Sequence, residues 1–167
     1  CAGIIGATVS SLIMFKTLDV SQMGNGAIAA LVAITAPCAF VEPWAAVVIG
    51  LFAGLIVPPL VVAIDKIKVD DPVGALPVHG MAGIWGTLAA GLFATADRAE
   101  ALAVGEAGLL VGGGASQLWV QFYGVAATVG FTLDLPSDPA TLPRDAAGGI
   151  EPLFHRGHSV AAREGFT

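Results

Sequence analysis

Residues 71–93 read DPVGALPVHGMAGIWGTLAAGLF, and no charged side chain follows Asp71 in this stretch. The stretch belongs to the uncharged run 72–96, in which His79 is the only ionisable residue. A helix needs about 20 mostly apolar residues to span the hydrocarbon layer of a bilayer. The run therefore predicts a membrane-spanning helix near residues 72–95 that carries a single histidine.

The rest of the chain repeats this pattern on both sides. Further uncharged runs occupy residues 1–15, 20–41, 43–64 and 107–133. Only 12% of the 167 residues are charged, whereas soluble domains average roughly 25%. The sequence predicts an all-α, polytopic membrane helix bundle embedded in a lipid bilayer. We expect its other membrane helices near residues 1–16, 25–41, 43–66 and 114–132.

Composition also excludes several classes of protein. The net charge of −6, with seven Lys and Arg residues, argues against nucleic-acid binding, which needs a basic face. The sequence shows no nucleophile–base pair, and Gly112-Gly113-Gly114 lacks the Lys of a phosphate-binding loop. His155 and His158 have no acidic or Cys partner at a ligand spacing. We expect no enzyme activity, no cofactor and no metal site.

Loop charges predict the orientation of the chain. If the five runs span a membrane, Lys16, Lys66 and Lys68 fall on one side and Arg98 on the other. The positive-inside rule places the lysine loops in the cytoplasm. The expected location is the cell membrane, and the segment after residue 133 would emerge on the cytoplasmic side.

Small residues recur at helical spacing within the runs. Lipid tails are as apolar as leucine, so membrane helices associate through close backbone contact, which small residues permit. We therefore expect helix-contact faces at these positions: Gly3 with Ala7, Gly26 with Ala30, Gly50 with Gly54, Ala82 with Gly86, and Gly86 with Ala90. About half of the glycines could instead simply be tolerated in lipid.

His79 is the candidate functional residue. Ionisable residues inside membrane spans are costly and usually face a bundle interior or a conduction path. A neutral imidazole has one donor and one acceptor nitrogen, so it could pass on a small polar molecule or simply bond a backbone carbonyl. Gly80, Gly83 and Gly86 would leave space beside the ring. Asp71 is expected to cap this helix and Pro72 to open it, which places His79 roughly 12 Å along the axis, near mid-membrane.

Several stretches resemble one known family. Residues 25–40, NGAIAALVAITAPCAF, strongly resemble the eighth membrane helix of the ammonium transporter (Amt/Rh) family. Residues 70–80, DDPVGALPVHG, with residues 86–93, GTLAAGLF, look like its loop and tenth helix. Residues 112–121 are similar to the entry into its eleventh helix.

The resemblance implies the second half of the ammonium transporter inverted-repeat fold over residues 1–132, from the seventh helix into the eleventh. It also implies a homotrimeric channel, in which ammonium is deprotonated and crosses as ammonia past two facing histidines. His79 matches the second of those histidines. Asp71 matches an acidic residue near the cytoplasmic mouth, and Asn25 matches a polar position there.

Departures from the family pattern leave alternatives open. The first half of the family fold is absent, so we expect an internal piece of a longer protein that needs the missing N-terminal half and is inactive alone. Residues 133–167 hold four prolines and eight charges and are expected to form an irregular, disordered tail. An ammonium sensor of the same family and a non-functional truncated gene product are the alternatives.

Overall fold

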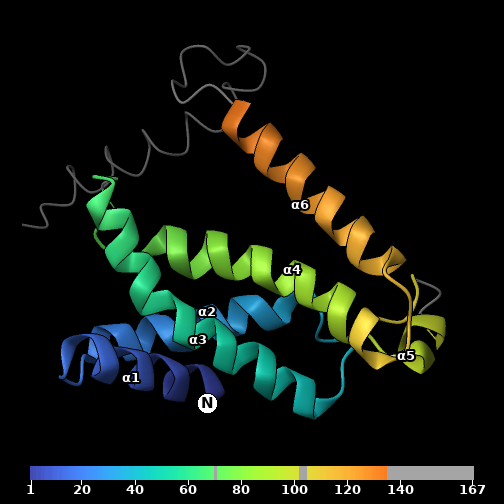
Figure 1. Cartoon of the computed structure of the whole chain (residues 1–167), viewed down its shortest axis with the longest axis horizontal. Coiled ribbons are helices and arrows are strands. Elements are labelled where there is room, and N and C mark those ends of the chain that lie inside the picture. Colours follow the sequence, from blue (N-terminus) through green and yellow to red (C-terminus); the bar gives the residue numbers. More distant parts are fainter. Residues whose placement is uncertain (70, 102–104, 135–167) are drawn as a thin grey trace, which may run out of the picture. The chain divides into compact units, whose positions relative to one another are not determined.

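Helices and their connections make up the described part of the protein, which a computed structural model gives for residues 1–69, 71–101 and 105–134 (Figure 1). The chain divides into two compact units, residues 1–127 and 128–167. Of the second unit, the structure describes only the end of the last helix. The elements are α1 (Ala2–Phe15), α2 (Val20–Thr35), α3 (Pro43–Lys66), η1 (Leu76–Met81), α4 (Ala82–Phe93), α5 (Ala96–Ala101), η2 (Leu109–Val111) and α6 (Ser116–Asp134).

Glycines bring α1, α2 and α3 into backbone contact, as their spacing predicted. A methyl group added to Gly3 would collide with the carbonyl of Gly26 on α2, and one added to Gly54 of α3 would collide with the carbonyl of Gly3. Gly26 in turn lies against the side chain of Ala7. These approaches leave no room for larger residues. The three helices therefore pack at a distance that only Gly and Ala permit.

Helix α2 begins and ends earlier than the sequence predicted. The span was expected over 25–41, but the helix runs from Val20 to Thr35. Its start is set by Asp19, whose carboxylate accepts hydrogen bonds from the amides of Ser21 (2.8 Å) and Gln22 (3.4 Å). Its end precedes Pro37, which lacks the N–H that another helical turn needs.

Helix α3 has the predicted bounds, Pro43–Lys66, with Pro43 in its first turn. Pro58 and Pro59 lie inside it, and the helix changes direction in its second half (Figure 1). Proline removes a backbone donor and clashes with the preceding turn, so a bend at this pair is expected. Pro58 is buried in the bundle, whereas Pro59 is exposed.

The segment expected as one helix over 72–95 has a different form. Residues 71–74 make a turn, in which the amide of Gly74 donates to the carbonyl of Asp71 at 3.2 Å. The helix follows as η1, a π-helix, and continues directly into α4. The prediction that Pro72 opens the helix is therefore wrong.

Helix α4 packs against both α2 and α3. Gly86 of α4 lies against the backbone of Ala33 on α2, and the indole of Trp85 donates to the carbonyl of Ile49 on α3 at 3.1 Å.

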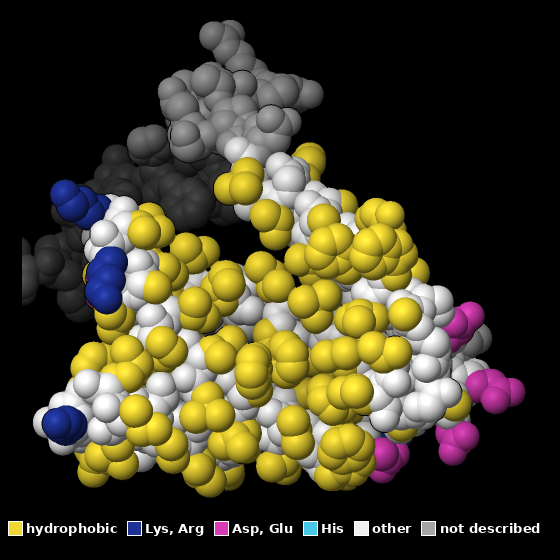
Figure 2. Space-filling view, viewed as in Figure 1, with side chains coloured by type: hydrophobic (Ala, Val, Ile, Leu, Met, Phe, Trp, Pro, Cys, Tyr) yellow, Lys and Arg dark blue, Asp and Glu magenta, His cyan; other side chains and the backbone are white. Residues whose placement is uncertain are grey.

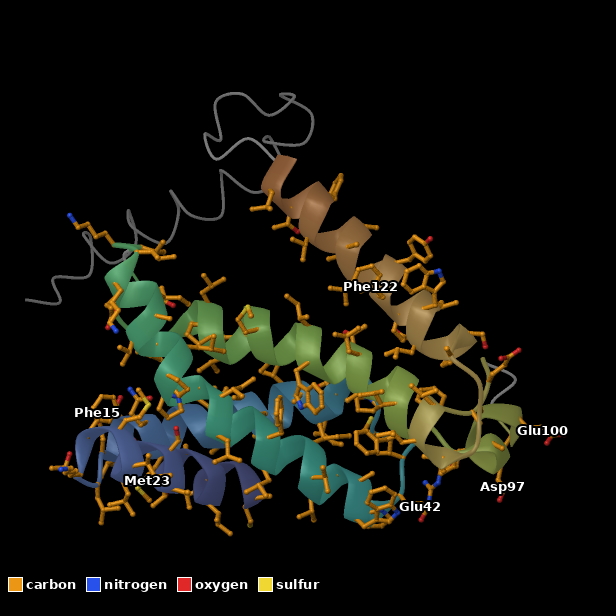
Figure 3. The ribbon with its side chains drawn as sticks, viewed as in Figure 1. Phe15, Met23, Glu42, Asp97, Glu100 and Phe122 are labelled. Atoms are coloured by element: carbon orange, nitrogen blue, oxygen red, sulfur yellow. The ribbon has the colours of Figure 1, made fainter. Side chains whose placement is uncertain are left out.

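The lysines mark one end of this unit, although the same segments also carry Asp19, Asp65 and Asp71. The lysines of the connections after α1 and α3 lie at one end, and acidic side chains lie at the other (Figure 2). Glu42, Asp97 and Glu100 mark the acidic end, whereas Phe15 and Met23 lie at the lysine end (Figure 3). The guanidinium of Arg98 binds the carboxylate of Glu42 at 3.0 Å. The expected alternation of connections between two ends is therefore present in this unit.

Apolar side chains cover much of the exposed surface (Figure 2). The interior, in contrast, is built largely from alanine, including Ala29, Ala33, Ala45, Ala53, Ala82 and Ala89. Among the described residues, α3 and the continuous helix Leu76–Phe93 are long and apolar enough to cross a bilayer. Helices α1 and α2 are apolar but shorter, at 14 and 16 residues. A small-residue interior and an apolar exterior are expected for a bundle surrounded by lipid.

Helix contact at Gly86 should be sensitive to a single methyl group. Gly86→Ala places that methyl against the carbonyl of Ala33, and overpacking of this kind costs about 1–3 kcal/mol. Gly83→Ala is the matched control on the same helix, because the added carbon would lie at 3.9 Å from Val32, an ordinary contact. Thermal unfolding of the chain in detergent should show a lower midpoint for Gly86→Ala alone. Equal midpoints for the two variants would contradict this packing.

Candidate functional site

His79 lies on the π-helix η1, Leu76–Met81. The wide turn is shown by the amide of Ala82, which donates to the carbonyl of Pro77 five residues earlier. Such π turns are rare and are frequently found at functional sites. The imidazole is exposed, and it makes no side-chain hydrogen bond to the residues that the structure describes.

The opposite side of η1 is packed into the bundle. Pro77 is fully buried and Val78 is 3% exposed. Val78 belongs to the apolar core that includes Ala29 and Ala33 of α2. One side of the π-helix is therefore packed against the bundle, and His79 lies on the exposed side.

Asn25 of α2 supplies a hydrogen bond that the helix itself lacks. Val73 lies in the turn before the helix, and Pro77, four residues later, has no N–H to offer its carbonyl. The side-chain amide of Asn25 donates to this carbonyl at 3.3 Å. Gly74, at φ +73°, makes room for the contact, since a Cβ there would lie 3.1 Å from Asn25 Nδ2. A residue 48 positions away thus completes the start of η1.

Asp71 caps the same helix start. Its Oδ1 accepts from the amide of Ala75 at 2.7 Å, and its Oδ2 accepts from the amide of Leu76 at 2.8 Å. Both amides belong to the first turn, whose donors have no partner within the helix. A carboxylate at this end also interacts favourably with the helix dipole. Asp71 thus binds amides at the helix start, as predicted, but from four and five residues away rather than from the position directly before the helix.

The three predicted site residues are therefore arranged in two parts. Asn25 binds the turn 71–74 through the carbonyl of Val73. Asp71, the first residue of that turn, binds two amides of the helix start that follows. His79 follows about one turn later and contacts neither of them by a hydrogen bond that the structure shows. The depth of 12 Å assumed that the helix runs from Pro72. Because it starts later, that estimate lacks its basis, and the mid-membrane position stays a prediction.

The glycines beside His79 have unequal surroundings. A Cβ on Gly80 would meet only Leu76 of the same helix, and one on Gly83 would make an ordinary contact with Val32. Gly86 packs directly against the backbone of Ala33 on α2, which leaves no space beside it. The open space expected along all three glycines is therefore not found: Gly86 is closely packed, Gly80 lies near Leu76 and Gly83 near Val32.

The π-helix, the carbonyl of Val73 and the role of Gly74 were missed by the sequence analysis. A sequence signal for the contact of Val73 is Pro77, which has no N–H to offer the carbonyl four residues before it. Within residues 1–69, 71–101 and 105–134, no three His, Cys, Asp or Glu side chains gather to hold a metal ion. The chemistry available at His79 is hydrogen bonding and proton exchange by one imidazole.

Fold and site together define a membrane helix bundle that presents one histidine on a π-helix. A sequence model of the Ammonium Transporter Family matches residues 1–135. The chain belongs to this family, whose members are transporters rather than a class of enzymes.

Individual relatives agree with that assignment. Ammonium transporter Amt2 of Archaeoglobus fulgidus is 45% identical over 111 residues, which cover 66% of this chain and 23% of the relative. The ammonium transporter of Bacillus subtilis is 39% identical over 131 residues, 78% of this chain and 31% of the relative. The crystal structure of Mep2 from Saccharomyces cerevisiae superposes with a TM-score of 0.70 at 26% identity, over 78% of this chain and 30% of that one. The all-α membrane fold expected from the sequence is confirmed, and the chain spans less than a third of the length of these relatives.

Loss of the Asp71 cap should loosen the start of η1. Asp71→Ala removes the acceptors for two amides, and such caps contribute about 0.5–2 kcal/mol. Hydrogen exchange in detergent should become faster at the amides of Ala75 and Leu76. Asp19→Ala is the matched control, because it removes the cap of α2 and should leave those two amides unchanged. Unaltered exchange in Asp71→Ala would show that the carboxylate does not hold this helix start.

Proposed function

We propose that this chain forms one wall of a path for ammonium and ammonia across the cell membrane, with His79 lining that path. The observation that carries the proposal is the exposed imidazole of His79, on a π-helix whose opposite side is buried in the bundle. Membership of the Ammonium Transporter Family supports the choice of substrate. Polar groups within membrane spans usually face a bundle interior or a conduction path, which supports the placement.

Each group at the site has a distinct proposed role. A neutral imidazole at His79 would accept a hydrogen bond from ammonia with one nitrogen and donate one with the other. Ammonia could then exchange one partner for the next without re-entering bulk water. Asp71 and Asn25 would act as positioning residues near the cytoplasmic mouth, since both bind the backbone that leads into η1. This arrangement fixes the direction in which His79 points.

The remainder of the path is proposed to come from outside this chain. His79 has no hydrogen-bonding partner among the described residues, and an unpaired polar group away from water costs about 1–3 kcal/mol. The family resemblance supplies a facing histidine from the first half of the inverted repeat. We therefore expect the chain to be inactive alone, to need a matching N-terminal half, and to assemble as a homotrimer once that half is present.

Uptake of labelled methylammonium into vesicles tests this proposal. The chain alone should give background uptake, and co-expression with the N-terminal half of the Bacillus subtilis relative should raise it. His79→Ala should abolish the gain, because the exchange of hydrogen bonds at the imidazole is lost. Met81→Ala, an exposed residue of the same π-helix, is the matched control and should keep it. Uptake by the chain alone that His79→Ala leaves unchanged would refute the role of His79.

Orientation can be tested separately by cysteine labelling. Lys66→Cys should react only from the cytoplasmic side and Arg98→Cys only from the opposite side, because the two residues lie at opposite ends of the unit and lysines prefer the cytoplasm. The native Cys1 and Cys38 are both exposed, so both are first replaced by Ser. Reaction of both introduced cysteines from the same side would contradict the arrangement.

A further inference from the structure

Two buried polar atoms in the helix bundle have no hydrogen-bond partner among the described residues: Ser11 Oγ on α1 and Gln22 Oε1 on α2. Ser11 is fully buried. Neither residue takes part in the site around His79. A buried polar group without a partner costs about 1–3 kcal/mol, so such groups are nearly always paired with protein or with ordered water.

The contacts between α1 and α2 place these two residues at the same level. Gly3 lies against Gly26 and Ala30, and Gly26 lies against Ala7. The helices are thus antiparallel, and each step of four along α1 matches a step of four back along α2. Ser11 is one such step after Ala7, and Gln22 is one step before Gly26. Residues four apart share a helix face, so both side chains belong to the α1–α2 contact.

Helix α3 completes the same level with its proline pair. Gly6 of α1 lies against Leu51, Gly54 and Leu55 of α3. Ser11 is five residues after Gly6 on α1 and Pro58 is three residues after Leu55 on α3, so we infer that Pro58, which is fully buried, lies near the level of Ser11. Because Pro58 and Pro59 carry no N–H, they cannot donate to the carbonyls of Gly54 and Leu55 as a regular helix would. Two side-chain oxygens without a partner, Ser11 Oγ and Gln22 Oε1, therefore lie near a part of α3 where two backbone hydrogen bonds are missing.

We propose that an ordered water molecule is bound between α1, α2 and α3 at the level of Ser11, Gln22 and Pro58. The water would accept the Ser11 hydroxyl hydrogen and donate to Gln22 Oε1. Its second hydrogen is available to a carbonyl that the prolines leave without a helical donor. Buried waters typically make about three hydrogen bonds to otherwise unpaired polar groups, which is the number that this level offers.

A double-mutant cycle measures whether the two side chains share one partner. With a bridging water, Ser11→Ala and Gln22→Met should each lower the midpoint of thermal unfolding in detergent, and the double variant should lose less than the sum. If the level is dry, each variant removes an unpaired polar group and should raise the midpoint. That result, or strictly additive losses, would overturn the proposal. Ser10→Ala combined with Gln22→Met is the matched control, since Ser10 already bonds Met14 Sδ at 4.0 Å, and its losses should add.

Density for the unmodified chain gives a second test that needs no variant to fold. At a resolution that shows ordered water, a peak should lie about 2.5–3.0 Å from both Ser11 Oγ and Gln22 Oε1. A direct bond between the two side chains would also couple them in the cycle, but it would leave no peak. Absence of the peak would therefore overturn the proposal even where coupling is found.

Discussion

The carbonyl of Val73 sets the constraint on which the candidate site depends. Val73 lies in the turn before η1, and Pro77, four residues later, has no N–H to offer its carbonyl. The bond comes instead from Asn25 on α2, so the start of η1 is tied to a different helix. Asp71 then binds the two free amides that follow. The helix start that precedes His79 is thus held by side chains outside the helix itself.

The close packing of α2 against its neighbours supports this helix start. Helix α2 lies against α1 through Gly26, against α4 through Ala33 and Gly86, and against the turn before η1 through Asn25. In lipid these contacts derive their stability from van der Waals packing and hydrogen bonds rather than from the hydrophobic effect. The interior is correspondingly built from Ala and Gly, and large apolar residues lie outside. Helix α2 therefore connects the packing of the bundle with the geometry of the site.

Sequence reasoning succeeded where a local signal marks the boundary. Helix α3 has its predicted ends because Pro43 opens it and the charged residues after Ile64 close the apolar run. Helix α2 was misplaced because the cap of Asp19 was overlooked. The π-helix was missed because it depends on Pro77 and on a partner 48 residues away. Asn25, Asp71 and His79 were all named from the sequence. That Asn25 and Asp71 bind the start of η1, whereas the imidazole of His79 is exposed, could be learned only from the three-dimensional contacts.

The connection between α1 and α2 has a consequence for how the bundle is assembled during synthesis. Only residues 16–19 separate the two helices, so the contacts of Gly3 and Ala7 with Gly26 close a short loop. Contacts of low sequence separation form fastest, and the two helices can therefore enter a bilayer as one preformed hairpin. Helix α3 follows in the chain, and its Gly54 fits against Gly3 of this hairpin. A preformed hairpin would thereby set the position at which α3 joins it.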